Sequence, residues 1–294
     1  FLATVLGEEE QQRSILRPYG IAVHKDQLIM CDSRLDGLVL ADFSSRTIEH
    51  FLPTGYGKMG LPLNVDIDTI GNVYVADTKR RQVIMFSKDL EFLETFGDPE
   101  KGKPVDVQRV GNELWVLDME QQKIDIYNIG NKNLLRSFPE RKGEDDPQNF
   151  YNPANMKVTA DRVYVSDIGD ARVKSYDLQG NFINAFGGHG KNMGQFTRPK
   201  GIDVDRDGNI YVVDAAFQNV QIFDSTGKLL MFFGKYNTDR DLYLPAGIYI
   251  DYEHTERYQE FVLPGYDLKY IIFVTNQYGP RKVHVYGFIK PKTE

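Results

Sequence analysis

Short runs of alternating apolar and polar residues, rich in β-branched and aromatic side chains, recur along the whole chain. In residues 199–234 four such runs (GIDV, NIYVVD, VQIF and LLMFF) are separated by turn residues, among them Asp207-Gly208-Asn209 and Ser225-Thr226-Gly227. This pattern predicts four antiparallel strands joined by tight hairpins. A single sheet of this kind has two apolar faces and cannot bury either of them alone, so neighbouring units must cover it.

The same four-strand unit recurs with a nearly constant period. A proline opens each copy, and subtracting successive positions gives steps of 44, 42, 49, 46 and 46 residues. The six prolines are Pro18, Pro62, Pro104, Pro153, Pro199 and Pro245. A period in the forties with four strands per unit is typical of propeller blades. We therefore predict an all-β fold, a six-bladed β-propeller of four-stranded antiparallel blades, with residues 1–294 as a single domain.

The second predicted strand of every unit ends on a small polar residue. These residues are Asp32, Asp77, Asp118, Asp167, Asp214 and Asn276. A carboxylate or amide oxygen at this position can accept hydrogen bonds from the backbone of the turn that follows. We therefore expect a structural role for this ring of acids, which is to fix the hairpin between strands two and three.

The units resemble NHL repeats. Residues 199–214 show the resemblance well, with PKGIDV at the start, DGN in the first turn and YVVD at the end of the second strand; the connector 187–199 also resembles that of the family. Blade three departs from the pattern, with Asp106 in place of the early glycine. The resemblance, to exported bacterial propellers in particular, implies a six-bladed ring that serves as a binding platform or, in some members, as an enzyme.

The two ends of the chain suggest how the ring closes. Residues 1–7 precede Pro18 at the spacing at which the predicted fourth strands precede later prolines, whereas the last unit supplies only three strands. We therefore expect residues 1–7 to complete blade six. An insertion at 252–269 separates the first two strands of blade six and is too aromatic for a flexible tether. We expect it to fold against the face beneath it, where it could cap the channel.

Charge and composition argue against several classes of function and of covalent feature. The formal net charge is −7 and the pI is near 5.4, which argues against a nucleic-acid partner held through its phosphates. No run of 18 apolar residues is present, so no membrane span is expected. The single cysteine, Cys31, excludes an internal disulfide and a Cys-x-x-Cys-His haem attachment.

The sequence begins without methionine. A signal peptide or lipid-anchored leader ahead of Phe1 would explain this, and so would a sequence that starts inside the protein. Together with the resemblance, this favours an exported protein that is periplasmic, outer-membrane-associated or extracellular.

Candidate catalytic motifs are few. The five histidines lack metal-ligand spacing, and only His24 lies at the end of a predicted inner strand. Carboxylates at Asp205 and Asp207 resemble the start of a calcium loop, but the strand that follows favours a hairpin turn. Neither a nucleophile elbow nor a P-loop occurs in the sequence. These residues predict no resident cofactor.

One polar position recurs in the inner strands, four residues after each opening proline. Its occupants, which we predict to line the channel, are Ala22, Asp66, Gln108, Lys157, Asp203 and Tyr249. Hydrogen bonding between blades is the favoured role of these residues. The alternative is an axial divalent metal such as calcium, bound by Asn64, Asp66, Asn155 and Asp203 in imitation of the axial calcium site of lactonase-type propellers.

Arginines and aromatic residues gather in the loops that we expect on one face of the ring. The predicted partner-binding residues are Arg34, Arg80, Arg81, Phe150, Tyr151, Phe217, Tyr278 and Arg281. Such a mixture is typical of protein-binding surfaces. We therefore predict a non-enzymatic scaffold for a protein or polymer partner; the resemblance also suggests an exported redox protein such as a multihaem cytochrome. The alternative is a propeller hydrolase or lyase with an axial divalent metal.

Overall fold

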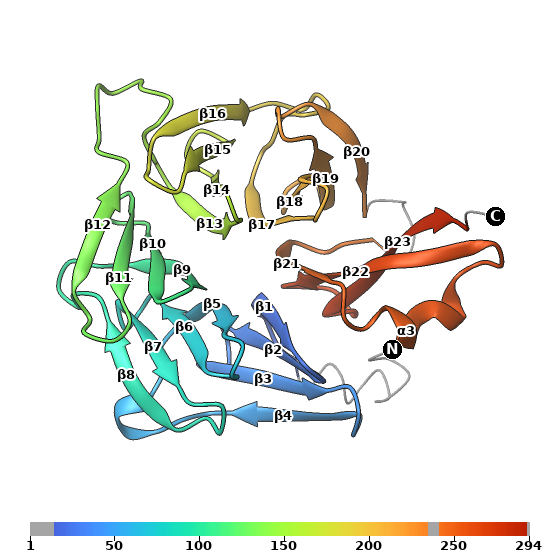
Figure 1. Cartoon of the computed structure of the whole chain (residues 1–294), viewed down its shortest axis with the longest axis horizontal. Coiled ribbons are helices and arrows are strands. Elements are labelled where there is room, and N and C mark those ends of the chain that lie inside the picture. The colour runs from blue at the N-terminus through green and yellow to red at the C-terminus, as the bar shows by residue number, and fades with distance from the viewer. Residues whose placement is uncertain (1–14, 235–240, 293–294) are drawn as a thin grey trace.

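The computed structural model describes residues 15–234 and 241–292, and in it six antiparallel sheets stand around a common axis (Figure 1). Blade one contains β1 (Pro18–His24), β2 (Gln27–Asp32), β3 (Gly37–Asp42) and β4 (Thr47–Phe51). Blade two contains β5 (Pro62–Ile67), β6 (Val73–Asp77), β7 (Gln82–Phe86) and β8 (Phe92–Phe96). Blade three contains β9 (Pro104–Val110), β10 (Glu113–Asp118), β11 (Lys123–Asn128) and β12 (Leu134–Phe138).

The second half of the ring repeats this order. Blade four contains β13 (Pro153–Val158), β14 (Arg162–Asp167), β15 (Arg172–Asp177) and β16 (Phe182–Gly187). Blade five contains β17 (Pro199–Val204), β18 (Ile210–Asp214), β19 (Asn219–Phe223) and β20 (Leu229–Phe233). Blade six contains β21 (Pro245–Asp251), β22 (Tyr266–Asn276) and β23 (Val283–Pro291). The predicted six-bladed all-β propeller is confirmed, and each repeat proline is the first residue of an inner strand.

Apolar clusters between adjacent blades form the core. There are six such clusters among the described residues, and one of them joins the last blade to the first: Met30 and Val39 pack with Ile271 and Phe273. Each sheet therefore buries both faces against its two neighbours, which is what a single blade could not do alone. The predicted completion of blade six by residues 1–7 lies outside the described residues.

The polar residue at the end of each second strand ties two segments together. In blade five, Asp214 accepts bonds from the backbone N–H groups of Ala216 (2.9 Å) and Phe217 (3.0 Å), which confirms the predicted turn contact. Its other oxygen accepts from Thr197 N–H (2.7 Å) in the linker ahead of β17, a contact that the repeat pattern did not predict. Asn276 of blade six instead accepts from Tyr243 N–H (3.0 Å) and donates to the Arg281 carbonyl (2.9 Å).

These bonds place the turns between second and third strands beside the linkers between blades. We call this side of the ring the linker face and the other side the opposite face. The same contacts recur in blades one to four, where the carboxylates of Asp32, Asp77, Asp118 and Asp167 each accept from both segments.

The insertion of blade six lies on the opposite face and carries two short helices, α3 (Thr255–Tyr258) and η2 (Gln259–Phe261). Arg257 donates to the Phe43 carbonyl (3.2 Å) and pairs with Asp26, so the segment docks on blade one. The expected folding against the ring is seen. The first two residues of the insertion, Tyr252 and Glu253, line the wider of the two axial cavities described below, whereas its helical part lines neither. A third short helix, η1 (Gly55–Gly57), precedes blade two. Within the described residues, no helix is long and apolar enough to cross a membrane.

We predict that Asp214→Ala lowers the free energy of unfolding by about 3 kcal/mol, because several backbone N–H groups lose their buried acceptor. Asp214→Asn should cost less, since Asn276 holds the corresponding linker in blade six. Urea unfolding of the variants measures this. The control is Asp224→Ala, which removes an exposed turn carboxylate with similar bonds to Thr226 and Lys228. A loss in Asp214→Ala no greater than in this control would contradict the assignment.

Candidate functional site

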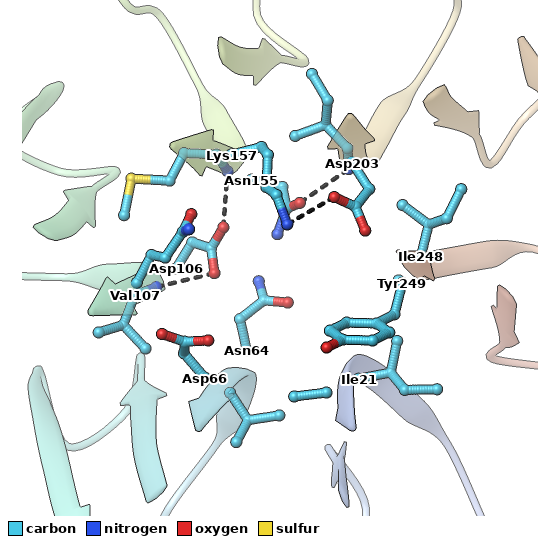
Figure 2. Close-up of a pocket in the computed structure, with 16 residues that line it drawn as sticks. Ile21, Asn64, Asp66, Asp106, Val107, Asn155, Lys157, Asp203, Ile248 and Tyr249 are labelled. Atoms are coloured by element: carbon cyan, nitrogen blue, oxygen red, sulfur yellow. Dashed lines mark hydrogen bonds and ion pairs between the residues drawn. The ribbon is translucent and has the colours of Figure 1, made fainter. Parts of the chain in front are cut away.

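The inner strands β1, β5, β9, β13, β17 and β21 surround a small polar cavity on the axis (Figure 2). Its volume is about 70 Å³, enough for a few water molecules but not for a substrate. The six residues at the recurrent polar position all line it: Ala22, Asp66, Gln108, Lys157, Asp203 and Tyr249. Asn64, Asp106 and Asn155, which lie two residues after the opening proline, complete the polar lining.

Side chains at the recurrent polar position, four residues after the opening proline, bond to the main chain of the next blade. Asp66 accepts from Arg109 N–H (2.6 Å), and Asp203 accepts from Ile250 N–H (2.7 Å). Gln108 uses both ends of its amide, because Oε1 accepts from Val158 N–H (2.8 Å) and Nε2 donates to the carbonyl of the same residue (3.1 Å).

In blade six, too, the side chain at this position bonds to the next blade around the ring, which is blade one. The Tyr249 hydroxyl donates to the Val23 carbonyl (3.2 Å). Side-chain hydrogen bonds therefore join inner strands that belong to separate sheets, which is the favoured role expected for these residues.

The position two residues after the proline works in the same way. Asp106 accepts from Met156 N–H (2.7 Å), and Asn155 accepts from Ile202 N–H (2.9 Å). In blades one, five and six the residue is glycine because the next strand lies too close for a side chain. A Cβ on Gly201 would lie 2.5 Å from the Ala246 carbonyl oxygen. Asp106 is a channel residue that the count of four from each proline does not identify, although its replacement of the repeat glycine is the available signal.

Burial controls the charge of the acids in the channel. It raises the pKa of Asp106 to about 8, against the opposing effect of the N–H groups of Met156 and Val107. Burial likewise raises the pKa of Asp66 to about 6, although the Arg109 N–H favours its charged form. Near neutral pH the Asp106 carboxyl is therefore largely protonated.

Lys157 supplies the positive charge of the channel. Its ammonium lies 2.7 Å from Asp203 Oδ1 and points into the cavity (Figure 2). Burial acts to lower the pKa of Lys157, but the pKa is raised overall because the attraction of Asp203, Asp66 and Asp106 outweighs burial.

The residues of the channel do not fit an axial calcium ion. Asp203 is already occupied by Lys157 and by the N–H groups of Val204 and Ile250, and Asn155 Oδ1 is held by Ile202. The ammonium of Lys157 stands where a divalent cation would have to approach these oxygens. In the part of the chain that the structure describes, no three His, Cys, Asp or Glu side chains come close enough to hold a metal ion.

A second axial cavity, of about 310 Å³, opens on the opposite face and contains His24. Asp68, Glu253 and the Arg206–Tyr252 pair also line it, with the guanidinium 4.0 Å from the centre of the tyrosine ring. The Asp68 carboxylate is held by its own turn, since it accepts from Ile70 N–H (3.0 Å).

The predicted partner-binding residues lie around the linker face, with one exception. Arg34 is exposed in the β2–β3 turn, and Tyr278 is 53% exposed in the β22–β23 turn. The remaining residues are half-buried: Arg80, Arg81, Tyr151, Phe217 and Arg281. Some already have partners, such as Arg81, which pairs with Glu120 (3.1 Å), and Tyr151, whose hydroxyl donates to the Glu144 carbonyl (2.6 Å).

The prediction that Phe150 belongs to this surface is wrong. Its ring is 1% exposed and packs edge-on against Tyr176, with 5.6 Å between the ring centres. Phe150 stands three residues before an opening proline, and the residues at this position in four other linkers, Ile15, Met59, Phe196 and Leu242, are buried as well. The position anchors each linker in the core, and its apolar character was the sequence signal.

The raised pKa values give a testable pH dependence. A carboxyl group whose pKa is higher in the folded state than in the unfolded chain stabilises the fold most at low pH, and this contribution is lost as the pH rises through the folded pKa. We therefore predict that the free energy of unfolding falls between pH 5 and pH 8, and that it falls less in Asp106→Asn. Urea unfolding at several pH values measures both slopes. Asp224→Asn, on the surface, should follow the unmodified chain; a parallel slope in Asp106→Asn would contradict the assignment.

Comparisons with known proteins agree with this architecture. The model of a family described as a 6-bladed beta-propeller, DUF5128, matches residues 145–285. NHL repeat-containing protein 3 of Mus musculus is 27% identical, over 58% of this chain and 54% of the mouse protein. The chain thus spans about half the length of this curated relative.

Several solved structures have the same fold. A Bacteroides thetaiotaomicron protein of unknown function superposes with a TM-score of 0.69 at 14% identity, covering 94% of this chain and 70% of that one. A streptogramin B lyase gives 0.64 at 14% identity, with 96% and 85% covered. A gluconolactonase of Xanthomonas campestris gives 0.63 at 15% identity, with 93% and 87% covered. At these identities the likeness shows the fold alone. Blade architecture, repeats and relatives together identify the chain as an NHL-like six-bladed β-propeller.

Proposed function

We propose that this propeller is a non-enzymatic scaffold that binds a protein partner on its linker face. The observation that carries the proposal is the use of the axial polar groups. In the channel, Asp66, Asp106, Asn155 and Asp203 bond to the main chain of the next blade. The cavity that they surround, of about 70 Å³, is too small for a substrate. Chemistry on the axis would have to break the bonds that join the blades.

The linker face, in contrast, presents side chains suited to binding a protein. Arg34 forms no side-chain ion pair with any described residue, and the Tyr278 ring is largely exposed. Arginine and tyrosine are enriched where binding energy concentrates in protein interfaces, because each combines a broad apolar or planar surface with hydrogen-bonding groups. Half-buried Phe217 adds an apolar contact on the same face.

The proposed location is the cell envelope or the outside of the cell. It rests on the resemblance of the repeats to those of exported bacterial propellers. In that setting an exported redox protein, such as a multihaem cytochrome, is one candidate partner, and a surface polymer is another.

A metal-dependent lyase or hydrolase is the second candidate. It is favoured by the likeness in fold to a streptogramin B lyase and a gluconolactonase. Metal analysis of the protein purified from its own source without chelators separates the two functions. The scaffold predicts no stoichiometric divalent ion. One ion per chain that is lost in Asp66→Asn or Asp203→Asn would favour the enzyme.

The scaffold proposal predicts a partner that depends on the linker face. Arg34→Glu combined with Arg80→Glu reverses two charges there and should reduce the amount of co-purifying partner by roughly tenfold or more. Native mass spectrometry of the tagged protein from its own source measures this. Lys88→Glu combined with Lys228→Glu makes the same charge change in turns of the opposite face and should retain the partner. Equal retention by both double variants, or the absence of any partner on the unmodified chain, would contradict the proposal.

A further inference from the structure

Three cationic side chains lie near one another at the linker-face ends of the inner strands β1 and β17, which help to surround the channel. Arg17 and Arg198 each stand directly before an opening proline, that of β1 and that of β17. Lys200 is the second residue of β17, and its ammonium lies 4.7 Å from the centre of the Tyr19 ring of β1. The cluster therefore bridges blades five and one across blade six.

Lys200 is buried without a counter-ion among the described residues. It is 3% exposed, and its ammonium donates to Gln277 Oε1 (3.2 Å), a neutral acceptor. Lys174, which is also buried, shows the usual arrangement, because its ammonium lies 2.8 Å from Asp167 and 3.0 Å from Asp170. A buried ammonium is costly unless an anion is close to it. Lys200 therefore differs from Lys174 in that its buried ammonium has no carboxylate partner among the described residues.

The neighbouring arginines increase the positive charge. Neither Arg17 nor Arg198 forms an ion pair with a described residue; the Arg17 guanidinium lies 5.1 Å from the centre of the Tyr278 ring, and its Nε is buried without a hydrogen-bond partner. Burial, followed by repulsion from Arg198 and Arg17, lowers the pKa of Lys200 to about 7.

The two groups that contact the Lys200 ammonium, the Tyr19 ring and the Gln277 side chain, carry no negative charge at neutral pH. The carboxyl groups around the site are Asp106, which is largely protonated, and Asp32 and Asp214, which accept hydrogen bonds from the main-chain N–H groups of Arg17 and Arg198. Burial raises the pKa of the Tyr19 hydroxyl to about 12, and Gln277 does not ionise. Lys282 donates to the Gln277 carbonyl (3.4 Å), and its own pKa is lowered by burial, which Asp32 partly opposes. A concentration of unpaired positive charge in a chain of net charge −7 indicates that the anion comes from outside the described residues.

We propose that Arg17, Arg198 and Lys200 form a binding site for a carboxylate group of the protein partner. The inference rests on the proposed function and gives the partner a chemistry: an acidic segment whose carboxylate reaches the linker-face ends of β1 and β17. A protein presents anions chiefly as carboxylates, and the planar guanidinium group matches a carboxylate with two parallel hydrogen bonds. The Lys200 ammonium would then pair with the buried end of the same group.

The affinity of the proposed site for a carboxylate should decrease as the pH rises. A carboxylate favours the ammonium form of Lys200, so binding takes up protons and weakens as the pH rises through 7. With a pKa of about 7 for the free protein, affinity should fall by about tenfold between pH 6 and pH 8. Glutamate side chains stay ionised over this range, so the peptide contributes no change of its own.

Isothermal titration calorimetry of the intact chain with N-acetylated hexaglutamate tests the proposal, with hexaglutamine as the neutral probe. We expect binding of hexaglutamate alone, tighter at pH 6 than at pH 8. Lys200→Met should markedly reduce the pH dependence, the remainder of which comes from the ionisation of Asp66 and Asp106 in the channel. Arg198→Ala should weaken binding at both pH values. Lys228→Met, an exposed lysine in the β19–β20 turn of the opposite face, is the matched control. Thermal unfolding of each variant shows whether the fold is retained.

Three results would overturn the inference. They are equal binding of hexaglutamine, an unchanged pH dependence in Lys200→Met, and tight binding of inorganic phosphate without binding of hexaglutamate. The last would make this a phosphate site. Any of them would leave the scaffold proposal standing if the Arg34→Glu, Arg80→Glu double variant still loses its partner, so the two failures can be told apart.

Discussion

Hydrogen bonds from side chains of one inner strand to the main chain of the next are the interaction on which the ring depends. The six sheets are separate, so no strand ladder joins one blade to another. The inner edge of each sheet would therefore expose unpaired N–H and C=O groups to a nearly closed cavity, at a cost of about 1–3 kcal/mol for each group. Asp66, Gln108 and Asp203 satisfy such groups and set the spacing of the blades at the same time.

This arrangement explains why the axis is polar and yet poorly suited to chemistry. Burial keeps Asp106 largely protonated near neutral pH, and Lys157 neutralises Asp203. Asp66, with a pKa of about 6, keeps most of its negative charge near neutral pH, so the channel carries a small net negative charge. What remains for function is the linker face, where loops vary without disturbing the frame and where positive charge is left unbalanced around Lys200.

Much of the frame could be predicted from sequence because it repeats. The opening prolines gave the first residue of every inner strand, and a fixed count from them gave Asp66, Lys157 and Tyr249 as residues of the channel. The acid that ends each second strand was assigned to the following turn correctly. Periodicity reports the strand register, and the register determines which side chains lie at the same height in the ring.

The prediction that failed and the contacts that were not predicted all depend on packing between different blades and linkers. The long, polar linker around Phe150 predicts a surface position for this residue, yet its ring anchors the linker in the core. Two further contacts join residues that are distant in sequence. One is the hydrogen bond from each linker to the acid that ends the second strand, as from Thr197 to Asp214, and the other is the contact of Lys200 with the Tyr19 ring. No pattern within a single repeat carries such information, because these contacts arise only when the ring closes.

The central claim is that the axial polar side chains hold the blades together, and native-state hydrogen exchange of their main-chain partners tests it most directly. These partners are the main-chain N–H groups of Arg109, Met156, Val158, Ile202 and Ile250, which donate to the axial side chains instead of to another strand. The account predicts that they exchange only through global unfolding, as slowly as the amides of central strands such as β14 and β18. Exchange at the rate of the surface turns would show that the channel is an open, mobile site and would contradict the account.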